Sequence, residues 1–306
     1  EELELPMPNH NLHIGSAREQ LILMTEKLAP ILVSERPDIV FVQGDTNTAL
    51  AASIVASRLG ITLAHVEAGL RSYDRTMPEE PNRLIADQLA DFLFCPTEVQ
   101  KNILIKEGFE PEKIFVVGNT IVDSLNTSIG LAKNRLHLLE KHGVNPGEFF
   151  LLTCHRESNT ETEESLNEIL SGVSQLAEEE KVICLFPVHP RLNSKIHIID
   201  KFKNIKRLEP LGYLDFLFLQ NNTKFIFTDS GGVQEESCVL QKKCVVLRTN
   251  TERPEALTVG GAKLLSRIHK DEVIAVYNYL KDKNVDWSSP FGDGQSASKI
   301  MDIVLK

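Results

Sequence analysis

The stretch TDSGGVQEE, residues 228–236, decides how this chain is expected to fold. The apolar run KFIF at 224–227 precedes it and predicts a short buried strand, while residues 233–240 have helical spacing. Between the two, Ser230–Gly232 forms a tight turn. A strand, a glycine turn and a helix start bring backbone N–H groups and the positive end of a helix to one point, and this arrangement suits a phosphate or diphosphate.

Glu236 lies one turn into the same helix, where its carboxylate is placed to bind paired hydroxyls such as those of a ribose. The alternative is that Gly231 and Gly232 serve only to let a strand and a helix pack closely. A single Gly-Gly turn leaves both interpretations open.

Composition limits the classes of protein to which the chain can belong. Its 306 residues are enough for two domains, and 33 Lys+Arg against 43 Asp+Glu argue against general nucleic-acid binding. Five cysteines without CxxC spacing indicate reduced cytoplasmic thiols rather than disulfides or a zinc site. No apolar run reaches the length of a membrane span and no signal peptide is visible, so no membrane partner is expected.

Strands and helices alternate along the first half of the chain, which predicts a parallel, Rossmann-like sheet. The predicted strands are 39–43, 62–66, 92–95 and 114–117, and the predicted helices are 17–33, 47–59, 81–90 and 97–107, with Pro81 opening the third and Thr97 capping the fourth.

A long predicted helix at 121–142 leads to a linker at 144–147, after which the alternation restarts. We therefore predict two Rossmann-like domains, residues 1–143 with the final helix 293–306, and residues 144–292. The predicted strands of the second half are 149–153, 182–187, 205–208, 225–227, 244–247 and 262–265, and its other predicted helices are 161–177, 212–219, 233–240 and 270–281.

Polar residues that end buried strands are the candidates for chemistry, because ligands bind at the carboxyl ends of parallel strands. Asp45, Glu67 and His155 stand at such positions, and a polar loop of residues 70–80 adds Glu79. Carboxylates that share a site raise one another's pKa, so Asp45, Glu67 and Glu79 could supply an acid and a base.

Each candidate also has an ordinary structural interpretation. Asp45 could cap the helix that follows it, and Glu79 and Glu80 could complement a helix dipole. His65 is expected to be packed, and His155 could be a surface histidine. No compact set of metal ligands, P-loop or G-x-G-x-x-G pattern occurs, so no metal, hydrolysable nucleotide or nicotinamide is indicated.

Nine motifs follow one another along the chain: QGDTNTALA (43–51), HVEAGLRS (65–72), MPEEPNR (77–83), PTE (96–98), VGNTIVD (117–123), CHRES (154–158), TDSGGVQEE (228–236), TERPEA (251–256) and FGDG (291–294). Taken together in this order, the motifs closely resemble the non-hydrolysing UDP-N-acetylglucosamine 2-epimerases. The resemblance covers the chain from about residue 10 to its end. It implies a GT-B fold, in which two Rossmann-like domains with parallel sheets face a central cleft that holds the sugar nucleotide.

The resemblance also implies a reaction. A base removes the C2 proton of UDP-N-acetylglucosamine while UDP leaves C1, and UDP then adds back to the 2-acetamidoglucal to give UDP-N-acetylmannosamine, without a cofactor. It implies a homodimer, and the cysteines already indicate a cytoplasmic protein. The residues that match the family's site are Asp45, Glu67 and Glu79 as acid and base, His155 at the diphosphate, Ser230, Gly231 and Gly232 at the phosphates, Glu236 at the ribose, Arg253 at the nucleotide, and Leu211 and Phe216 at the uracil.

Two departures from the family pattern concern the beginning of the chain. The opening strand with its G-T-R-P-E loop has no counterpart, and residues 15–20 look shorter than the family version. The sequence is therefore expected to be a fragment that lacks its first βαβ unit and is weakly active or inactive. The alternatives are a hydrolysing epimerase, a GT-B glycosyltransferase and a catalytically inactive UDP-sugar-binding fragment.

Overall fold

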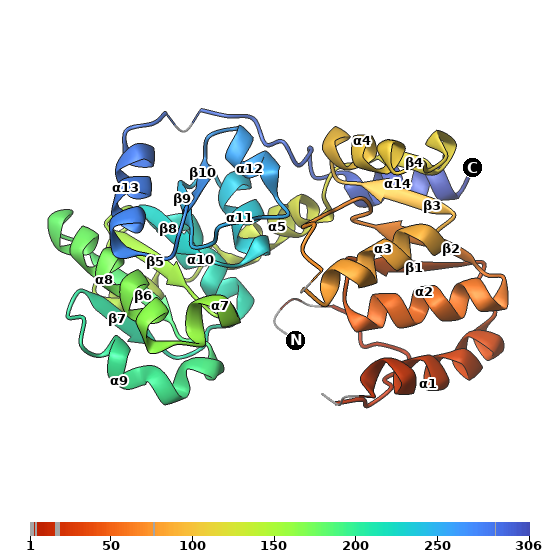
Figure 1. Ribbon diagram of the computed structural model, residues 1–306, viewed down its shortest axis with the longest axis horizontal. Coiled ribbons are helices and arrows are strands. Elements are labelled where there is room, and N and C mark those ends of the chain that lie inside the picture. Colours follow the sequence, from red (N-terminus) through yellow and green to blue (C-terminus); the bar gives the residue numbers. More distant parts are fainter. Residues whose placement is uncertain (1–2, 4, 16–18, 76, 285) are drawn as a thin grey trace. The chain divides into compact units, whose positions relative to one another are not determined.

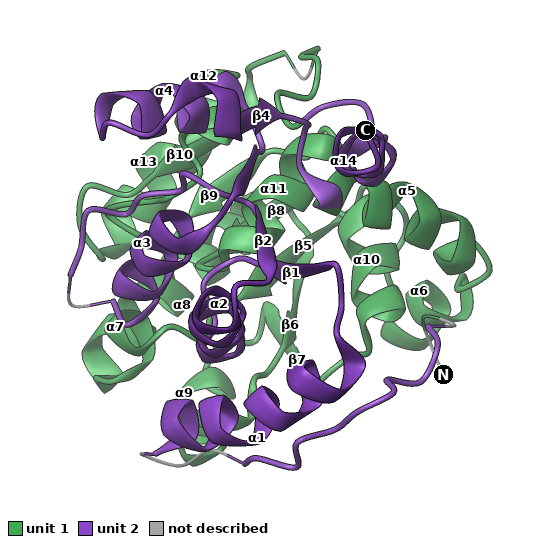
Figure 2. Ribbon diagram, turned by 90° about the vertical axis from the view of Figure 1, so that its right-hand side faces the viewer, with its two compact units in different colours: residues 1–4, 121–291 green, residues 5–120, 292–306 purple. Residues whose placement is uncertain are grey.

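A computed structural model describes residues 3, 5–15, 19–75, 77–284 and 286–306. The predicted start of the first helix at residue 17, and residues 16–18 of the shortened motif, lie outside the described residues. The chain divides into two compact units, unit 1 built from Ile121–Phe291 and unit 2 from Leu5–Thr120 with Gly292–Lys306 (Figure 2).

Unit 2 contains a parallel sheet in the order β1-β2-β3-β4 (Figure 1). The register pairs Val42 with His65 and Val66 with Phe94, so the carboxyl ends of the strands lie along one edge of the sheet. The bounds are β1 Ile39–Gln43, β2 Thr62–Val66, β3 Phe92–Cys95 and β4 Ile114–Val116, close to the predicted strands.

Two helices of unit 2, α2 and α4, begin at threonine caps. Thr46 and Thr97 cap α2 and α4 by accepting backbone N–H groups, and Gly60 ends α2 in the left-handed conformation. The prediction for Pro81 was wrong: α3 begins two residues earlier, and a proline is tolerated anywhere in the first turn. The bounds are α1 Gln20–Glu35, α2 Asn47–Leu59, α3 Glu79–Leu89, α4 Glu98–Lys106, the 3-10 helix η1 Pro111–Lys113 and α14 Ser296–Val304.

The strands of unit 2 are apolar on both faces, as a covered parallel sheet requires. One face, with Leu63 and Leu93, packs against alanines of α2 and Leu104 of α4. The other face, with Ala64 and Phe94, is covered by Ile300 of α14. The last helix of the chain is therefore part of the core of unit 2.

Unit 1 contains a parallel sheet in the order β10-β9-β8-β5-β6-β7 (Figure 1). The strand order reverses between β5 and β8, and this switch point is where ligands bind in open α/β sheets. At their carboxyl ends, the Thr153 and Thr228 hydroxyls lie 2.6 Å apart. The bounds are β5 Phe149–Thr153, β6 Ile183–Pro187, β7 Ile205–Leu208, β8 Phe225–Thr228, β9 Cys244–Val246 and β10 Ala262–Leu264.

The prediction of one long helix at 121–142 was wrong. The chain turns after Ala132, where Arg135 pairs with Asp215 of α10, and a second helix starts at His137. The bounds in unit 1 are α5 Thr120–Ala132, α6 His137–His142, α7 Glu157–Thr160, α8 Glu163–Glu179, the 3-10 helix η2 Pro190–Lys195, α9 Ile196–Ile199, α10 Tyr213–Asn222, α11 Gly231–Val239, α12 Pro254–Thr258 and α13 Lys270–Lys281.

Both faces of the unit 1 sheet are buried. Phe150 packs with residues of α8 and α13, whereas Leu151 packs on the opposite face with Leu125 of α5 and Leu139 of α6. Because α5 and α6 belong to this core, unit 1 begins at Ile121, earlier in the chain than the predicted linker at 144–147.

All five cysteines are buried and free, Cys95 in unit 2 and the other four in unit 1. Within the described residues no group of three or more His, Cys, Asp or Glu side chains could hold a metal ion. None of the helices in the described ranges is long and apolar enough to cross a membrane.

Candidate active site

The glycine turn of unit 1 joins β8 to the N-terminus of α11. Ser230 is the N-cap: its backbone N–H donates to the hydroxyl of Thr228 at 3.0 Å, and its own hydroxyl accepts from Val233 at 3.5 Å. The first helical residues are Gly231 and Gly232, whose N–H groups lack intrahelical acceptors by the geometry of any helix start. The turn therefore presents the anion-binding end of α11 at the switch point of the sheet.

Asp229 is the buried anchor beneath this turn. Its carboxylate accepts the backbone N–H groups of His155 and Arg156, each at 2.9 Å, and the amide of Asn159 at 3.0 Å. The His155 ring nitrogen Nδ1 lies 3.2 Å from the same carboxylate. Burial opposes ionisation of Asp229, but these hydrogen bonds outweigh it and hold its pKa below the usual value. Asp229 thus joins the ends of β5 and β8 and orients His155, whose side chain is 40 % exposed.

The two glycines of the turn differ in their surroundings. A Cβ added to Gly231 would lie 2.8 Å from Glu252 Oε1, so that residue serves the close packing considered above. A Cβ added to Gly232 would meet no described atom within 4 Å. Packing therefore accounts for Gly231 but not for Gly232, which faces open space at the helix start.

Glu236 is buried on α11 and accepts a hydrogen bond from the hydroxyl of Tyr213 at 3.1 Å. Burial raises its pKa to about 7, against partial opposition from hydrogen bonds of Tyr213 and Gln220. A carboxyl group with this pKa changes its charge near neutral pH. Its capacity to accept hydrogen bonds from ligand hydroxyls therefore changes with pH.

A cavity of about 210 Å³ opens beside the turn. His155 and Ser230 are among the residues that line it, and Leu211 and Phe216 supply apolar lining. Pockets that bind whole drug-sized ligands measure roughly 300–1,000 Å³, so this smaller space suits one part of a larger ligand, such as a planar base. The cavity brings together the predicted uracil residues and the predicted diphosphate residues.

Arg253 lies beside the same turn. Its Nε is 2.9 Å from Glu235 of α11, and its guanidinium carbon would be 3.7 Å from a Cβ on Gly231. The Arg253 side chain is only 12 % exposed, so its guanidinium is fixed by contacts with the protein and not surrounded by water.

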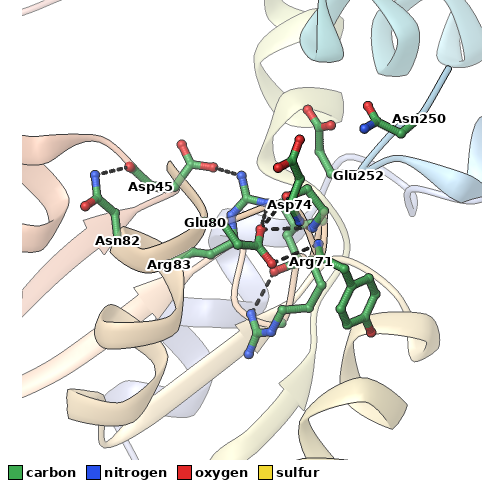
Figure 3. A network of polar contacts seen from close by, with 12 residues as sticks. Asp45, Arg71, Asp74, Glu80, Asn82, Arg83, Asn250 and Glu252 are labelled. Atoms are coloured by element: carbon green, nitrogen blue, oxygen red, sulfur yellow. Dashed lines mark hydrogen bonds and ion pairs between the residues drawn. The ribbon is translucent and has the colours of Figure 1, made fainter. Parts of the chain in front are cut away.

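In unit 2, Asp45 follows β1 and projects toward α3. Its carboxylate pairs with the buried guanidinium of Arg83, which also donates to Glu80 at 2.9 Å (Figure 3). The Asp45 carbonyl accepts from Asn82 at 2.9 Å. The helix cap is Thr46, so the capping role considered for Asp45 was wrong.

Glu67 lies at the end of the neighbouring strand β2, with a φ of 68° that is uncommon for a residue other than glycine. Gln43 donates to its Oε1 at 3.0 Å, and its Oε2 would lie 3.8 Å from a Cβ on Gly44. The structure therefore brings the carboxylates of Asp45 and Glu67 to the same end of adjacent strands.

The loop 70–80 is held by Glu80 rather than by Glu79. The Glu80 carboxylate accepts the backbone N–H groups of Ser72 at 2.9 Å and Tyr73 at 3.0 Å, and the Ser72 hydroxyl at 2.7 Å. Glu79 starts α3 and is half-buried, and the structure gives no contact that joins it to Asp45 or Glu67 within the described residues.

Two residues of these networks were not among the predicted site residues. Asp229 ends a buried strand, which is the criterion that selected Asp45, and Arg83 lies one turn along α3 from Glu79. Both positions could be seen in the sequence. Which polar residues hold a site together, however, depends on their contacts with other elements, and residue spacing does not reveal these contacts.

A family model described as UDP-N-acetylglucosamine 2-epimerase matches residues 1–305. The chain belongs to the UDP-N-acetylglucosamine 2-epimerase family. Family members of that name from Methanocaldococcus jannaschii and Methanococcus maripaludis are 45 % and 42 % identical to it, over 99 % and 100 % of this chain and 86 % of each relative. The expected membership of an epimerase family, a class of isomerase, is confirmed.

Solved structures of the UDP-N-acetylglucosamine 2-epimerase family agree. The Methanocaldococcus jannaschii enzyme in complex with UDP-GlcNAc and UDP has a TM-score of 0.90 at 44 % identity, covering 99 % of this chain and 86 % of that one. A UDP co-structure of MnaA from S. aureus has a TM-score of 0.88 at 31 % identity, with 97 % and 83 % coverage. Together with the two parallel sheets, these likenesses confirm the predicted GT-B fold class.

Proposed function

We propose that this chain interconverts UDP-N-acetylglucosamine and UDP-N-acetylmannosamine by inversion at C2. Relatives with this name, one of them solved with UDP-GlcNAc and UDP, support the substrate class. UDP leaves C1 as a proton is removed from C2, and it adds back to the 2-acetamidoglucal after a proton has arrived on the opposite face.

Unit 1 supplies the groups that hold UDP during this cycle. The N–H groups at the start of α11 and the guanidinium of Arg253 offer positive charge where the diphosphate becomes a leaving group, and the His155 ring can donate a hydrogen bond there. Stabilisation at this point lowers the barrier. Leu211 and Phe216 are apolar enough to receive the uracil, and Glu236 is placed for the ribose hydroxyls.

Unit 2 supplies the acid and the base. Asp45 and Glu67 come from adjacent strand ends, and Glu79 starts α3. Two carboxyl groups acting on opposite faces of C2 are the least that inversion by proton exchange needs. Arg83 and Gln43 fix the orientations of Asp45 and Glu67, and a fixed orientation is a requirement for proton transfer.

The observation that carries this proposal is the construction of the glycine turn. Asp229 is buried and saturated with hydrogen bonds to both strand ends, whereas Gly232 faces open space that packing does not require. A rigid support under an unobstructed helix start is what an anion of the size of a diphosphate needs.

The test follows UDP-N-acetylglucosamine in deuterium oxide by nuclear magnetic resonance. We expect UDP-N-acetylmannosamine to appear and deuterium to enter C2 of both sugars. Asp45→Asn is expected to abolish turnover while UDP binding, measured by calorimetry, survives. Release of free N-acetylmannosamine would instead identify a hydrolysing epimerase, sugar transfer without deuterium a glycosyltransferase, and UDP binding without any turnover an inactive fragment.

A second UDP-sugar should be tested in the same assay, because one relative is named for it. A relative from Pseudomonas aeruginosa that is 34 % identical over all of this chain and 86 % of its own length is named UDP-2,3-diacetamido-2,3-dideoxy-D-glucuronate 2-epimerase. That sugar carries a carboxylate at C6 and a second acetamido group at C3. Preference for it over UDP-N-acetylglucosamine would change the assigned substrate and leave the reaction type intact.

The proposal includes a cytoplasmic homodimer that binds no nucleic acid. The five free buried cysteines suit a reducing compartment, and the net charge of −10 disfavours contact with a polyanion.

A further inference from the structure

His65 is a fully buried histidine of β2 whose two ring nitrogens both have partners. Nε2 lies 2.9 Å from the carbonyl oxygen of Gly44, and Nδ1 lies 2.6 Å from the Asp87 carboxylate of α3. Gly44 is the residue immediately before Asp45. The histidine therefore bonds directly to the turn that carries a proposed catalytic carboxylate.

The partners determine the protonation of this ring. A carbonyl oxygen only accepts hydrogen bonds, so Nε2 must carry a proton. An ionised carboxylate also only accepts, so beside an ionised Asp87 the Nδ1 must carry one too. With both nitrogens protonated, His65 is an imidazolium cation inside unit 2.

The other groups that contact the Asp87 carboxylate are hydrogen-bond donors. Its second oxygen accepts from Arg71 Nη1 at 2.7 Å and from the Gly69 N–H at 3.2 Å. Arg71 in turn forms a bidentate pair with Glu107 at the end of α4, at 2.9 and 2.6 Å. The cluster thus contains two cations and two anions, and this balance is what makes buried charges tolerable.

We propose that His65 is a positioning residue that acts as an imidazolium, holding the Gly44 carbonyl and thereby the backbone from which the Asp45 carboxylate projects. The inference rests on the proposed epimerase reaction and adds to it a residue that does not touch the substrate. It is independent of the identity of the sugar.

The turn that His65 holds is constrained from the other side as well. Gly44 has a φ of 66°, and its N–H donates to the carbonyl of Val66 at 3.0 Å. Both polar groups of this peptide residue are therefore bonded to β2, one to its backbone and one to its buried side chain. Removing the imidazolium would free one of the two bonds and allow Asp45 to move relative to Glu67.

The charged surroundings support the same protonation state. Burial opposes a charged ring, but the hydrogen bond and charge of Asp87, the Gly44 carbonyl and the charge of Glu67 outweigh it and raise the pKa of His65. The remaining titratable neighbours of the cluster are Arg71 and Glu107, and the Cys95 thiol of β3, whose pKa burial raises.

The protonation state can be measured without any assay of activity. Nitrogen-15 resonances of the imidazole rings distinguish protonated from bare nitrogens, and the spectrum of His65→Gln assigns the signal of His65 among the nine histidines of the chain. We expect both ring nitrogens of His65 to remain protonated at pH 8, where exposed histidines are neutral. A bare Nδ1 at that pH would overturn the imidazolium assignment.

The positioning role is measured by steady-state kinetics with the UDP-sugar. His65→Gln, which keeps one donor without the charge, and Asp87→Asn are both expected to lower kcat roughly 10- to 100-fold, the size of effect that a misplaced catalytic group produces. The dissociation constant of UDP should change less than about twofold, because these residues belong to unit 2 while the proposed UDP contacts belong to unit 1.

A matched control lies at the other end of the same strand. Asp91 accepts the N–H of Leu63 at 2.9 Å, so Asp91→Asn weakens the anchoring of β2 away from Asp45 and should leave kcat unchanged. If the wild-type protein does not epimerise at all, the proposed function fails. If it does and His65→Gln turns over at the wild-type rate, the positioning role fails. Should His65→Gln not fold, a wild-type spectrum at pH 8 in which no histidine ring has both nitrogens protonated still overturns the imidazolium assignment.

Discussion

At the scale of single residues, the two glycines of the β8–α11 turn can be separated by experiment. Gly232→Ala adds a methyl group into open space at the start of α11, where a phosphate would lie. We expect the Tm to stay the same or rise slightly, because alanine is the better helix former, while UDP affinity falls at least about tenfold. Calorimetric titration with UDP and a thermal melt measure both quantities.

Gly231→Ala is the comparison for that variant. Its Cβ would lie 2.8 Å from Glu252, so we expect a lower Tm, by an amount corresponding to about 1–3 kcal/mol. Equal effects of the two substitutions on UDP binding and stability would mean that the glycine pair serves packing alone.

The buried carboxyl of Glu236 gives a second prediction, on stability. Its pKa is about 7 in the folded protein against 4.5 as the ordinary value, so the folded state holds a proton that the unfolded state releases between pH 4.5 and 7. Stability contributed by this group therefore falls as pH rises through that window. Glu236→Gln should raise the free energy of unfolding of unit 1 at pH 8, by up to about 3 kcal/mol, and change it little at pH 4.5.

The same group predicts how UDP binding depends on pH. Only the ionised carboxylate can accept hydrogen bonds from both ribose hydroxyls, so UDP affinity should increase as pH rises through about 7. Because UDP also titrates, the relevant quantity is the difference between wild type and Glu236→Gln across pH 5.5–8.5. Parallel curves for the two proteins would contradict a ribose contact through Glu236.

At the scale of elements, α14 is the helix whose packing makes the sharpest prediction. Ile300 is buried against Ala64 and Phe94, whereas the next residue, Met301, is 44 % exposed. Ile300→Ala should lower the stability of unit 2 by about 2–4 kcal/mol, and Met301→Ala should change it by less than about 0.5 kcal/mol. Denaturant unfolding followed by circular dichroism compares the two, and equal losses would exclude α14 from the core.

Elements were predicted well wherever a continuous apolar run could only be a strand. Residues 39–43, 62–66, 92–95 and 149–153 form strands with the predicted bounds. Where apolar spacing continued through a turn, as at 121–142, the segment between the two helices is held by Arg135, which pairs with Asp215, far away in the sequence. A local pattern cannot report such a contact.

For the candidate site, the sequence indicated the site residues but not the side chains that support them. Strand-end position and the resemblance together selected Asp45, Glu67, His155 and the glycine turn. The supports beneath them, Asp229, Arg83 and the His65 cluster, are buried side chains that bond to other elements of the fold. Their identity depends on tertiary packing, and so only the structure reveals them.

At the scale of the whole molecule, the oligomeric state stays a prediction. Light scattering coupled to size-exclusion chromatography should give twice the chain mass of 34.3 kDa if the protein is the homodimer that the family resemblance implies. Sedimentation velocity over a hundredfold range of concentration provides the check. A species of single-chain mass across that range would refute the dimer.

The buried thiols allow the unfolding of the two units to be followed separately by chemical modification. Cys95 reports on unit 2, and Cys154, Cys184, Cys238 and Cys244 report on unit 1, and all are shielded from alkylating reagents while the surrounding unit stays closed. Mass spectrometry of a chain exposed to iodoacetamide in dilute denaturant would then register which half becomes reactive first. Because UDP is proposed to bind unit 1, its addition should slow modification of the four thiols there more than that of Cys95.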